Sequence, residues 1–391
     1  MTQIMFPYLL FITLIACVMG VLNFYGRFFL PALSPALWNL IIILSGFLIA
    51  PWVEPRIVGI AMGVTLGVVL QLFFLLPSLY GIGFRYHISF NFSHPSVRRV
   101  LLLALPVALG FAATKINLLL NTLLATFLEE GSVSYLSYAF RIMHLPLGVF
   151  GVAVATVALP ILAKEAAREE TGRVRETFSS SFRLVFLLSL PASILFLVLA
   201  DPIIRILYER GNFTPEDTIQ TSKALQFYSI GIMGAASAKV VANTFYSLKD
   251  PNTPLKATWI SVFANLFLSL ILMRFLQFKG LALATSLSAL LNLILLLMGL
   301  RKKLERIDGW RILITSTKIF MTSLLMGIGV YLFVRWFEMS FFGGISPSFV
   351  LQTTEIIFSL LIASSIFLLF SFWLRIEEVK IITRGLIKVR K

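Results

Sequence analysis

The sequence YLSYAFRIMHLPLGVFGVAVATVALPILA, residues 135–163, decides how the rest of the chain is interpreted. It is long enough to cross a bilayer, which takes about 20 apolar residues in a helix. A basic residue, Arg141, nevertheless lies inside it. A guanidinium keeps its charge, and placing one in hydrocarbon costs at least roughly 2.5 kcal/mol. We therefore expect Arg141 to face water, a partner charge or an anionic ligand rather than lipid.

The helical neighbours of Arg141 agree with this expectation. Residues three, four and seven positions apart share a helix face. The face of Arg141 carries small and polar residues, namely Ser134, Ser137, Tyr138, His144, Gly148 and Ala155. The other face carries Ile, Leu, Val and Phe. The pattern predicts a transmembrane helix with one polar stripe that holds a fixed positive charge.

The composition places the chain among multi-span membrane proteins. Of its 391 residues 58% are hydrophobic and 13% are charged, and the mean hydropathy is +0.92. Soluble domains carry about 25% charged residues. The net charge of +15 is what the positive-inside rule predicts, so we expect no nucleic-acid partner. The single cysteine excludes an internal disulfide, and the absence of nucleotide-loop, hydrolase and metalloprotease motifs argues against an enzyme.

The hydropathy pattern predicts an all-α polytopic fold with about eleven transmembrane helices. Basic residues set the orientation: 22 of the 33 fall in alternate loops and the tail, and seven fall on the opposite side. This ratio places the C-terminus in the cytoplasm. The expected spans lie near residues 6–26, 33–51, 57–80, 100–127, 135–163, 183–207, 223–247, 255–275, 279–300, 312–335 and 350–374.

Two corners of the chain resemble each other. VLNFYGRFFLPALSP (21–35) and VANTFYSLKDPNTP (241–254) each combine Val-x-Asn, aromatic residues, a basic residue and two prolines. Six spans separate them, which suggests a parallel six-helix repeat of the kind found in transporters. The expected domains are a partial N-terminal lobe of three helices (1–80), a cytoplasmic inter-lobe loop (81–99), a six-helix C-terminal lobe (100–302), two additional helices (303–375) and a basic cytoplasmic tail (376–391). Within the C-terminal lobe, residues 164–182 are expected to form a charged cytoplasmic helix, with a solvated connector as the default interpretation.

Arg141 is the strongest candidate for binding a ligand. A guanidinium offers planar paired donors that suit phosphate, pyrophosphate or carboxylate. The alternative is a structural ion pair. Five acidic residues lie at span ends or in loops: Glu129, Glu130, Asp201, Glu209 and Glu338. We therefore expect no carboxylate deep in a span. Lys115 and Lys239 also lie within spans, but lysine can snorkel or lose its proton, which weakens their case.

A second candidate site consists of uncharged oxygen-bearing residues in three spans. One span carries Thr114, Asn117 and Asn121 on a shared helix face, and two later spans carry Asn265, Ser269 and Thr285. Hard cations such as sodium prefer oxygen ligands. Small polar residues also hold membrane helices together, and this second interpretation is favoured, although both stay open.

Six segments together carry a resemblance to a known family: FPYLLFITL (6–14), LNFYGRFFLPALSPALWNL (22–40), LALPVALG (103–110), YAFRIMHLPLGVFGVAVATVALP (138–160), YERGNFTPEDT (208–218) and FYSLKDPNTPLK (245–256). With these segments the chain resembles the MurJ (MviN) family of lipid II flippases, within the superfamily of multidrug and polysaccharide exporters. The resemblance implies a fourteen-helix carrier with two lobes. Such a carrier moves an undecaprenyl-pyrophosphate-linked peptidoglycan precursor across the bacterial cytoplasmic membrane by alternating access.

The resemblance also bears on the two candidate sites. Arg141 matches an arginine of the family's cationic cavity. Among the uncharged residues, the resemblance matches four to a sodium site of some members: Asn121, Asn265, Ser269 and Thr285. Ser269 stands where a carboxylate would be expected. No cofactor is expected, and the coupling would come from sodium or from the membrane potential.

The family's first three helices are absent before Met1 in this resemblance. The chain is therefore expected to begin partway through the architecture, with a separate segment as one source of those helices. The rival interpretations are another exporter of the same superfamily, for polysaccharide lipids or drugs, and a non-transporting remnant or scaffold.

Overall fold

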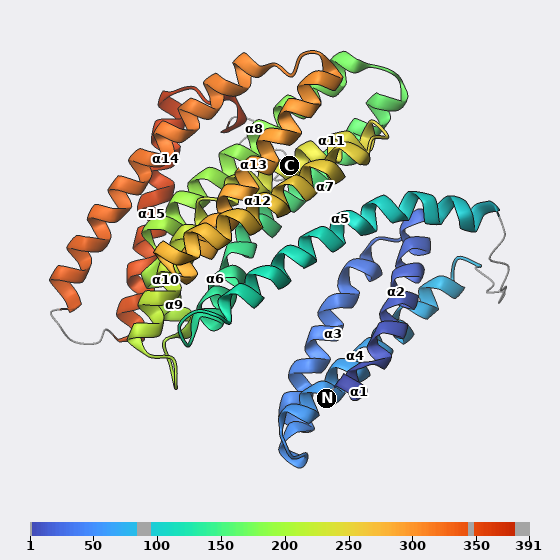
Figure 1. Cartoon of the computed structure of the whole chain (residues 1–391), viewed down its shortest axis with the longest axis horizontal. Helices are drawn as coiled ribbons and strands as arrows, with labels where there is room; N and C mark the ends of the chain where they lie inside the picture. The colour runs from blue at the N-terminus through green and yellow to red at the C-terminus, as the bar shows by residue number, and fades with distance from the viewer. Residues whose placement is uncertain (1, 84–94, 343–347, 380–391) are drawn as a thin grey trace, which may run out of the picture. The chain divides into compact units, whose positions relative to one another are not determined.

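A computed structural model describes residues 2–83, 95–342 and 348–379 of the chain. The described parts are helical and contain no strand (Figure 1). Ten helices are long and apolar enough to cross a membrane, or eleven when one bent pair is counted as a span. The predicted all-α polytopic fold is therefore confirmed. The helices form two compact units, Met1–His94 and Pro95–Lys391, which are described separately below.

The first unit contains three membrane-length helices, as the hydropathy pattern predicted. α4 packs against both α2 and α3. Two buried polar side chains face each other inside the unit, where Nε2 of Gln71 donates to Oγ of Ser34 over 3.0 Å. The elements are α1 (Thr2–Met5), α2 (Pro7–Phe24), α3 (Phe29–Leu48), a 3₁₀ turn η1 (Ala50–Trp52) and α4 (Ile57–Tyr80).

Glycines at intervals of four residues bring α3 and α4 close together. Gly59, Gly63 and Gly67 are buried on one face of α4. A Cβ added to Gly63 would lie 1.8 Å from Oγ of Ser45 on α3. Helices in lipid have little hydrophobic driving force to associate. Close approach of their backbones therefore supplies much of the packing energy between α3 and α4.

Replacing Gly63 by alanine is expected to destabilise the first unit by about 1–3 kcal/mol, because the added methyl group overpacks the α3–α4 contact. The measurement is detergent-induced unfolding of the chain in lipid nanodiscs. Gly46→Ala is the matched control, since a Cβ there would meet nothing within 4 Å. Adding Ser45→Gly should restore most of the loss, and equal stability of the Gly63→Ala and Gly46→Ala variants would contradict the packing argument.

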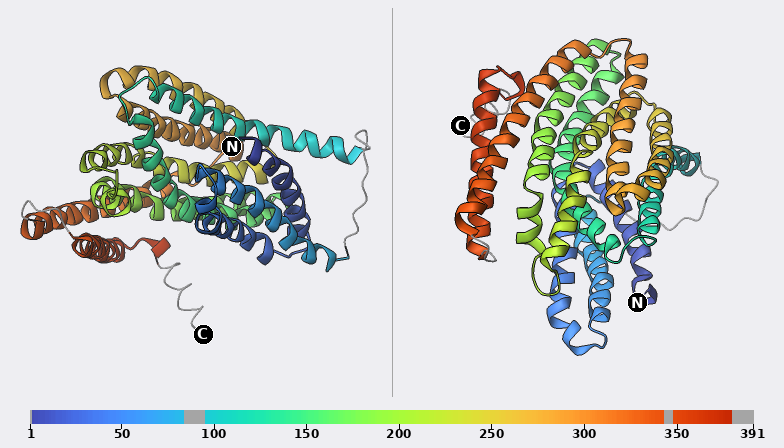
Figure 2. Two further views of the ribbon diagram at one scale, coloured as in Figure 1. Left: turned by 90° about the horizontal axis from the view of Figure 1, so that it is seen from below. Right: turned by 60° about the vertical axis from the view of Figure 1, so that its left-hand side comes forward.

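The second unit contains the remaining helices. α12 packs against α5 and α13, α11 packs against α8 and α13, and α14 packs against α8 and α15. Figure 2 shows α14 and α15 running side by side along one side of this unit. The elements are α5 (Pro95–Ala125), α6 (Ser132–Pro146), a π-helical segment η2 (Leu147–Val152), α7 (Ala153–Ala167), α8 (Thr171–Val198), α9 (Ala200–Tyr208), α10 (Pro215–Ser229), α11 (Ile232–Ser247), α12 (Asn252–Leu276), α13 (Phe278–Leu304), α14 (Gly309–Phe337), a second π-helical segment η3 (Glu338–Phe342) and α15 (Phe349–Trp373).

One predicted span is bent rather than straight. The segment expected at 223–247 consists of α10 and α11, which meet at an angle of 40°. The bend frees backbone carbonyls, which in a membrane need other donors. The Ser286 hydroxyl donates to the carbonyl of Phe227 over 2.6 Å, and the Ser193 hydroxyl donates to the carbonyl of Ser229. Hydroxyl groups on neighbouring helices therefore supply donors to carbonyls at the bend.

The segment after α15 docks onto the second unit. Ile376 and Val379 are buried against α8 and α14. A carboxylate oxygen of Glu378 lies 2.6 Å from Nη1 of the buried Arg183. Arg311 donates to Glu377 over 2.6 Å, and this hydrogen bond holds the pKa of Glu377 below its ordinary value. The first residues of the expected basic tail are thus packed in place, and residues 380–391 lie outside the described part.

The expected connector at 164–182 is mostly helix. α7 ends at Ala167 and α8 begins at Thr171. Val174 and Phe178, in the first turns of α8, are buried in the core of the second unit. The start of α8 is therefore charged in sequence but packs one apolar face against the core of the second unit. Composition alone did not predict this packing.

Candidate functional site

The span that carries Arg141 runs without interruption from Ser132 to Ala167 through α6, η2 and α7. On α6 the side chain of Arg141 is exposed, and so are Ser134, Ser137 and His144. Ala139, Ile142 and Met143, on the other face, are buried in the core. The polar stripe predicted from the spacing therefore lies on the outer face of α6.

The stripe ends earlier than predicted. Gly148 is exposed, but Ala155 is buried, so its assignment to the stripe is wrong. The π-helical segment η2 lies between them. An added residue in one turn rotates the following residues by about 100°. Ala155 consequently faces α11, and its carbonyl accepts a hydrogen bond from Nδ2 of Asn243 over 2.9 Å.

Arg141 makes no ion pair and no hydrogen bond with any residue that the structure describes. The predicted alternative, a structural ion pair, is thus not seen in that part of the chain. Lys115 on α5 and Lys239 on α11 are likewise exposed and lack such partners in the described ranges. Lys239 is the exposed member of an otherwise buried run from Ala236 to Val241. All three cations are therefore available to an anionic ligand.

The expectation that no carboxylate lies within a span is wrong. Glu355 lies in α15, inside the span predicted at 350–374, and is fully buried. The position of Glu355 within the predicted span is visible in the sequence itself. Arg183 was also missed, because it stood at the edge of a charged connector and its partner Glu378 is far along the chain.

Two depressions lie beside the ends of the α6–α7 span. One, of about 420 Å³, is lined by Ser134, Tyr138, Tyr208, Arg210 and Asn212 among others. The ring centroids of Tyr138 and Tyr208 are 4.7 Å apart. Tyr208 also lies within electrostatic reach of Arg141.

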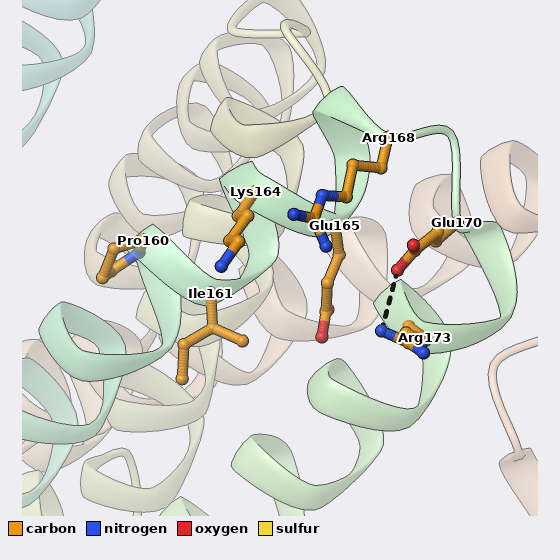
Figure 3. A pocket seen from close by; sticks show the side chains of 7 residues that line it. All are labelled: Pro160, Ile161, Lys164, Glu165, Arg168, Glu170 and Arg173. Atoms are coloured by element: carbon orange, nitrogen blue, oxygen red, sulfur yellow. Dashed lines mark ion pairs between the residues drawn. The ribbon is translucent and has the colours of Figure 1, made fainter.

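The other depression, of about 410 Å³, lies at the opposite end and is shown in Figure 3. Lys164 of α7 and Arg168, the residue after α7, line it together with an ion pair between Arg173 and Glu170, whose charged atoms are 3.2 Å apart. Glu165 accepts a hydrogen bond from the Thr177 hydroxyl over 3.0 Å. The lining carries three cations and two carboxylates, so its net charge is positive.

The four uncharged candidates come together where α5, α12 and α13 meet. Nδ2 of Asn121 donates to Oγ1 of Thr285 over 3.0 Å, and Nδ2 of Asn265 donates to the same oxygen over 3.4 Å. The Ser269 hydroxyl lies 3.3 Å from Oδ1 of both asparagines. Asn121, Asn265 and Ser269 are buried. The structure thus brings together the four residues that the family resemblance grouped.

The chemistry of this cluster fits a hydrogen-bonded link better than a sodium site. Its members are neutral, and no group of three or more acidic, histidine or cysteine side chains that could hold a metal occurs among the described residues. The Thr285 oxygen already accepts from two amides and donates to the carbonyl of Leu281. The sodium site stays a prediction.

Replacing Thr285 by valine is expected to cost about 1–3 kcal/mol of stability, because two buried amides lose their acceptor. Exchanging sodium for potassium at constant ionic strength should leave the melting temperature unchanged. Thermal unfolding measures both effects. Thr317→Val is the control, since that exposed hydroxyl bonds only a carbonyl of its own helix. A stabilisation specific to sodium that disappears in Thr285→Val would instead establish a cation site.

An ion pair and hydrogen bonds stabilise the turn that follows α11. Oδ2 of Asp250 lies 2.8 Å from Nζ of Lys303 at the end of α13, and the same carboxylate accepts hydrogen bonds from Thr253. Burial raises the pKa of Asp250, but these hydrogen bonds outweigh it and hold the pKa below its ordinary value. The corner FYSLKDPNTP therefore has a structural role at the second unit's surface.

The sequence profile of a protein family described as "Lipid II flippase MurJ" matches residues 1–352. The chain belongs to the MurJ family. A "Probable lipid II flippase MurJ" of Vibrio cholerae serotype O1 is 38% identical over 298 residues, which cover 76% of this chain and 57% of that relative. The MurJ relative of Rhizobium tropici is 31% identical over 397 residues, which cover 100% of this chain and 73% of the relative. The chain thus spans somewhat more than half to about three quarters of these MurJ proteins.

Solved structures agree with the MurJ assignment. The structure "Lipid II flippase MurJ, inward closed conformation" matches with a TM-score of 0.73 and 27% identity, over 93% of this chain and 72% of that one. A multidrug transporter of the MATE family matches with a TM-score of 0.65 at 14% identity, over 76% of this chain and 69% of that one. The second likeness shows a shared fold, and the first supports the carrier architecture implied by the sequence.

Proposed function

We propose that this chain contributes to a carrier that flips lipid II, the lipid-linked peptidoglycan precursor, from the inner to the outer leaflet of the bacterial cytoplasmic membrane. The observation that carries the proposal is the exposed Arg141 on a polar face of a transmembrane helix, where it pairs with no described residue, in a chain of the MurJ family. The role is transport and not enzymatic catalysis.

The chemistry of the ligand explains the need for fixed cations. A pyrophosphate headgroup carries negative charges that must leave bulk water during transfer, and a guanidinium can pair with them through two donors. Arg141 would hold the headgroup, and Lys115 and Lys239 would add positive charge on neighbouring helices. The lipid tail would stay in the bilayer while the carrier changes its accessible side.

The proposal also specifies the orientation of the chain in the membrane and the driving force for transport. The asymmetry of basic residues places the C-terminus in the cytoplasm. The basic depression around Lys164 and Arg168 would then lie on the cytoplasmic side, where the precursor enters. Because the four-residue cluster is neutral, we favour the membrane potential over sodium as the driving force. Moving one charge through 100 mV is worth about 2.3 kcal/mol.

The carrier also needs the parts of MurJ relatives that this chain does not cover. We propose that the corresponding helices, on this or another polypeptide, complete the pathway. A drug or polysaccharide exporter of the same fold and a non-transporting scaffold are the rival functions. Neither has a specific observation in its favour, since the likeness to multidrug transporters is limited to the fold.

Lipid II exposure in cells depleted of their own flippase tests the proposal. The cells would express a full-length relative, the chain alone, or the chain with the part of the relative that it does not cover. An outer-leaflet reagent that modifies lipid II would score the result. We expect exposure to be restored by the chain, alone or supplemented. If neither arm restores exposure although the protein is inserted in the membrane, the proposed function is wrong.

A further inference from the structure

Glu355 is the single charged residue of α15, and its side chain is fully buried. It lies six residues after Phe349, so it sits about 9 Å along the helix from its start. Neither carboxyl oxygen has a hydrogen-bond partner among the described residues. Ser359, one turn further along the same face, is also fully buried. A titratable group thus lies inside the packing of the second unit with no use in the mechanism above.

A second buried carboxyl in the same unit shows the contrast. Glu378 is equally buried, but its oxygen lies 2.6 Å from a guanidinium nitrogen of Arg183. An ion pair of this kind allows a buried carboxylate to keep its charge. Without such a partner, removing a carboxylate from water costs several kcal/mol. The group then takes up a proton instead.

The charges around Glu355 do not replace a dedicated partner. α15 packs against α9 and α14. Asp201 and Arg205 of α9 and Glu338 of η3 act on the Glu355 carboxyl electrostatically. The two acidic groups oppose its ionisation, whereas Arg205 favours it, and Arg205 itself forms an ion pair with Asp201.

The titratable groups near the same end of α14 are also engaged. Nε of Arg335 donates to the hydroxyl of Tyr331 over 3.3 Å. The elements packed against α15 therefore supply Glu355 with no ion pair among the described residues.

We propose that Glu355 is a proton-binding site of the second unit. Its carboxyl carries a proton while α9, α14 and α15 are packed as described. When these helices separate and water reaches the group, the O–H bond breaks, the proton passes to water and a carboxylate remains. Any rearrangement that opens this packing is therefore linked to proton release. The proposal concerns the second unit by itself and holds whatever lipid the chain carries.

Infrared difference spectroscopy of the full chain in lipid nanodiscs at about pH 5.5, more than one unit above the ordinary glutamate pKa, tests the proposal. A protonated carboxylic acid has a C=O stretch that is resolved from carboxylate bands. The spectrum of the wild type minus Glu355→Gln should contain one such stretch. The spectrum of the wild type minus Glu378→Gln should contain only carboxylate bands. Carboxylate bands in the Glu355 difference would overturn the proposal.

Stability against pH gives a second readout. A carboxyl that is protonated when folded and ionised when unfolded makes stability fall as pH rises from the ordinary glutamate pKa, about 4.3, up to the folded value. In that range the unfolding constant of the wild type should rise by up to about tenfold per pH unit relative to Glu355→Gln. Glutamine resembles the protonated acid, so this variant should fold. Parallel pH profiles for the two proteins would contradict proton binding at Glu355.

Discussion

Replacing Arg183 by methionine is expected to destabilise the second unit by about 3–5 kcal/mol, because it leaves the Glu378 carboxylate buried without a partner. The side chains of Arg183 and Glu378 are 6% and 2% exposed. Their ion pair also fixes the segment that carries Ile376 and Val379, so its loss should free this segment, which follows α15, from α8. Detergent-induced unfolding measures the change in stability, and limited proteolysis reports release of the segment.

Two further variants separate this effect from a general loss of charge. Arg173→Ala removes an arginine that is 67% exposed in its pair with Glu170, and surface pairs contribute only about 0–1 kcal/mol. Arg183→Met combined with Glu378→Leu removes both buried charges and should recover most of the stability. If the Arg183→Met variant is no less stable than the Arg173→Ala variant, the buried pair does not hold the segment after α15 in place.

Replacing Arg141 by alanine is expected to lower the rate of lipid II exposure by at least about thirtyfold. Removing one partner of a desolvated charge pair costs about 2–5 kcal/mol, and each 1.4 kcal/mol is a factor of ten. Arg141→Lys keeps the charge but loses the paired donors, so it should restore activity only in part. The assay in flippase-depleted cells described above, with a quantified time course, measures these rates.

Arg274→Ala is the matched control for Arg141. Arg274 is an exposed arginine in the last turn of α12, so it lies on a different helix from the polar stripe of α6. It should support exposure at the wild-type rate. Equal rates for the Arg141→Ala and Arg274→Ala variants would remove the basis for headgroup binding on α6.

The spans were predictable because the bilayer requires long apolar helices. The polar face of Arg141 followed from helical spacing alone. The position of Ala155 did not, because a π-helical turn leaves no mark in residue spacing. The bend between α10 and α11 also escaped prediction, since its carbonyls are satisfied by Ser193 and Ser286 from other helices.

Contacts between distant segments were the least predictable. The hydrogen bond between Asn121 and Thr285 joins residues 164 positions apart, and spacing along one helix does not reveal which helices meet. The family resemblance grouped these residues, whereas their chemistry alone favoured a structural link between helices and left a cation site open. Neither the spacing of residues nor the family resemblance predicted the pairing of Arg183 with Glu378. Hydropathy registers a charge in a sequence but not the partner that makes its burial tolerable.

Photocrosslinking from α6 is the measurement that tests the central claim most directly. A photoreactive amino acid would replace Ser137, which is exposed one turn before Arg141, or Phe263, which is exposed on α12. Membranes would contain lipid II labelled in its headgroup. We predict labelled adducts at position 137 that decrease strongly when Arg141→Ala is added, and few adducts at position 263. Equal labelling at both positions, or labelling at position 137 that does not depend on Arg141, would contradict headgroup binding by this face of the helix.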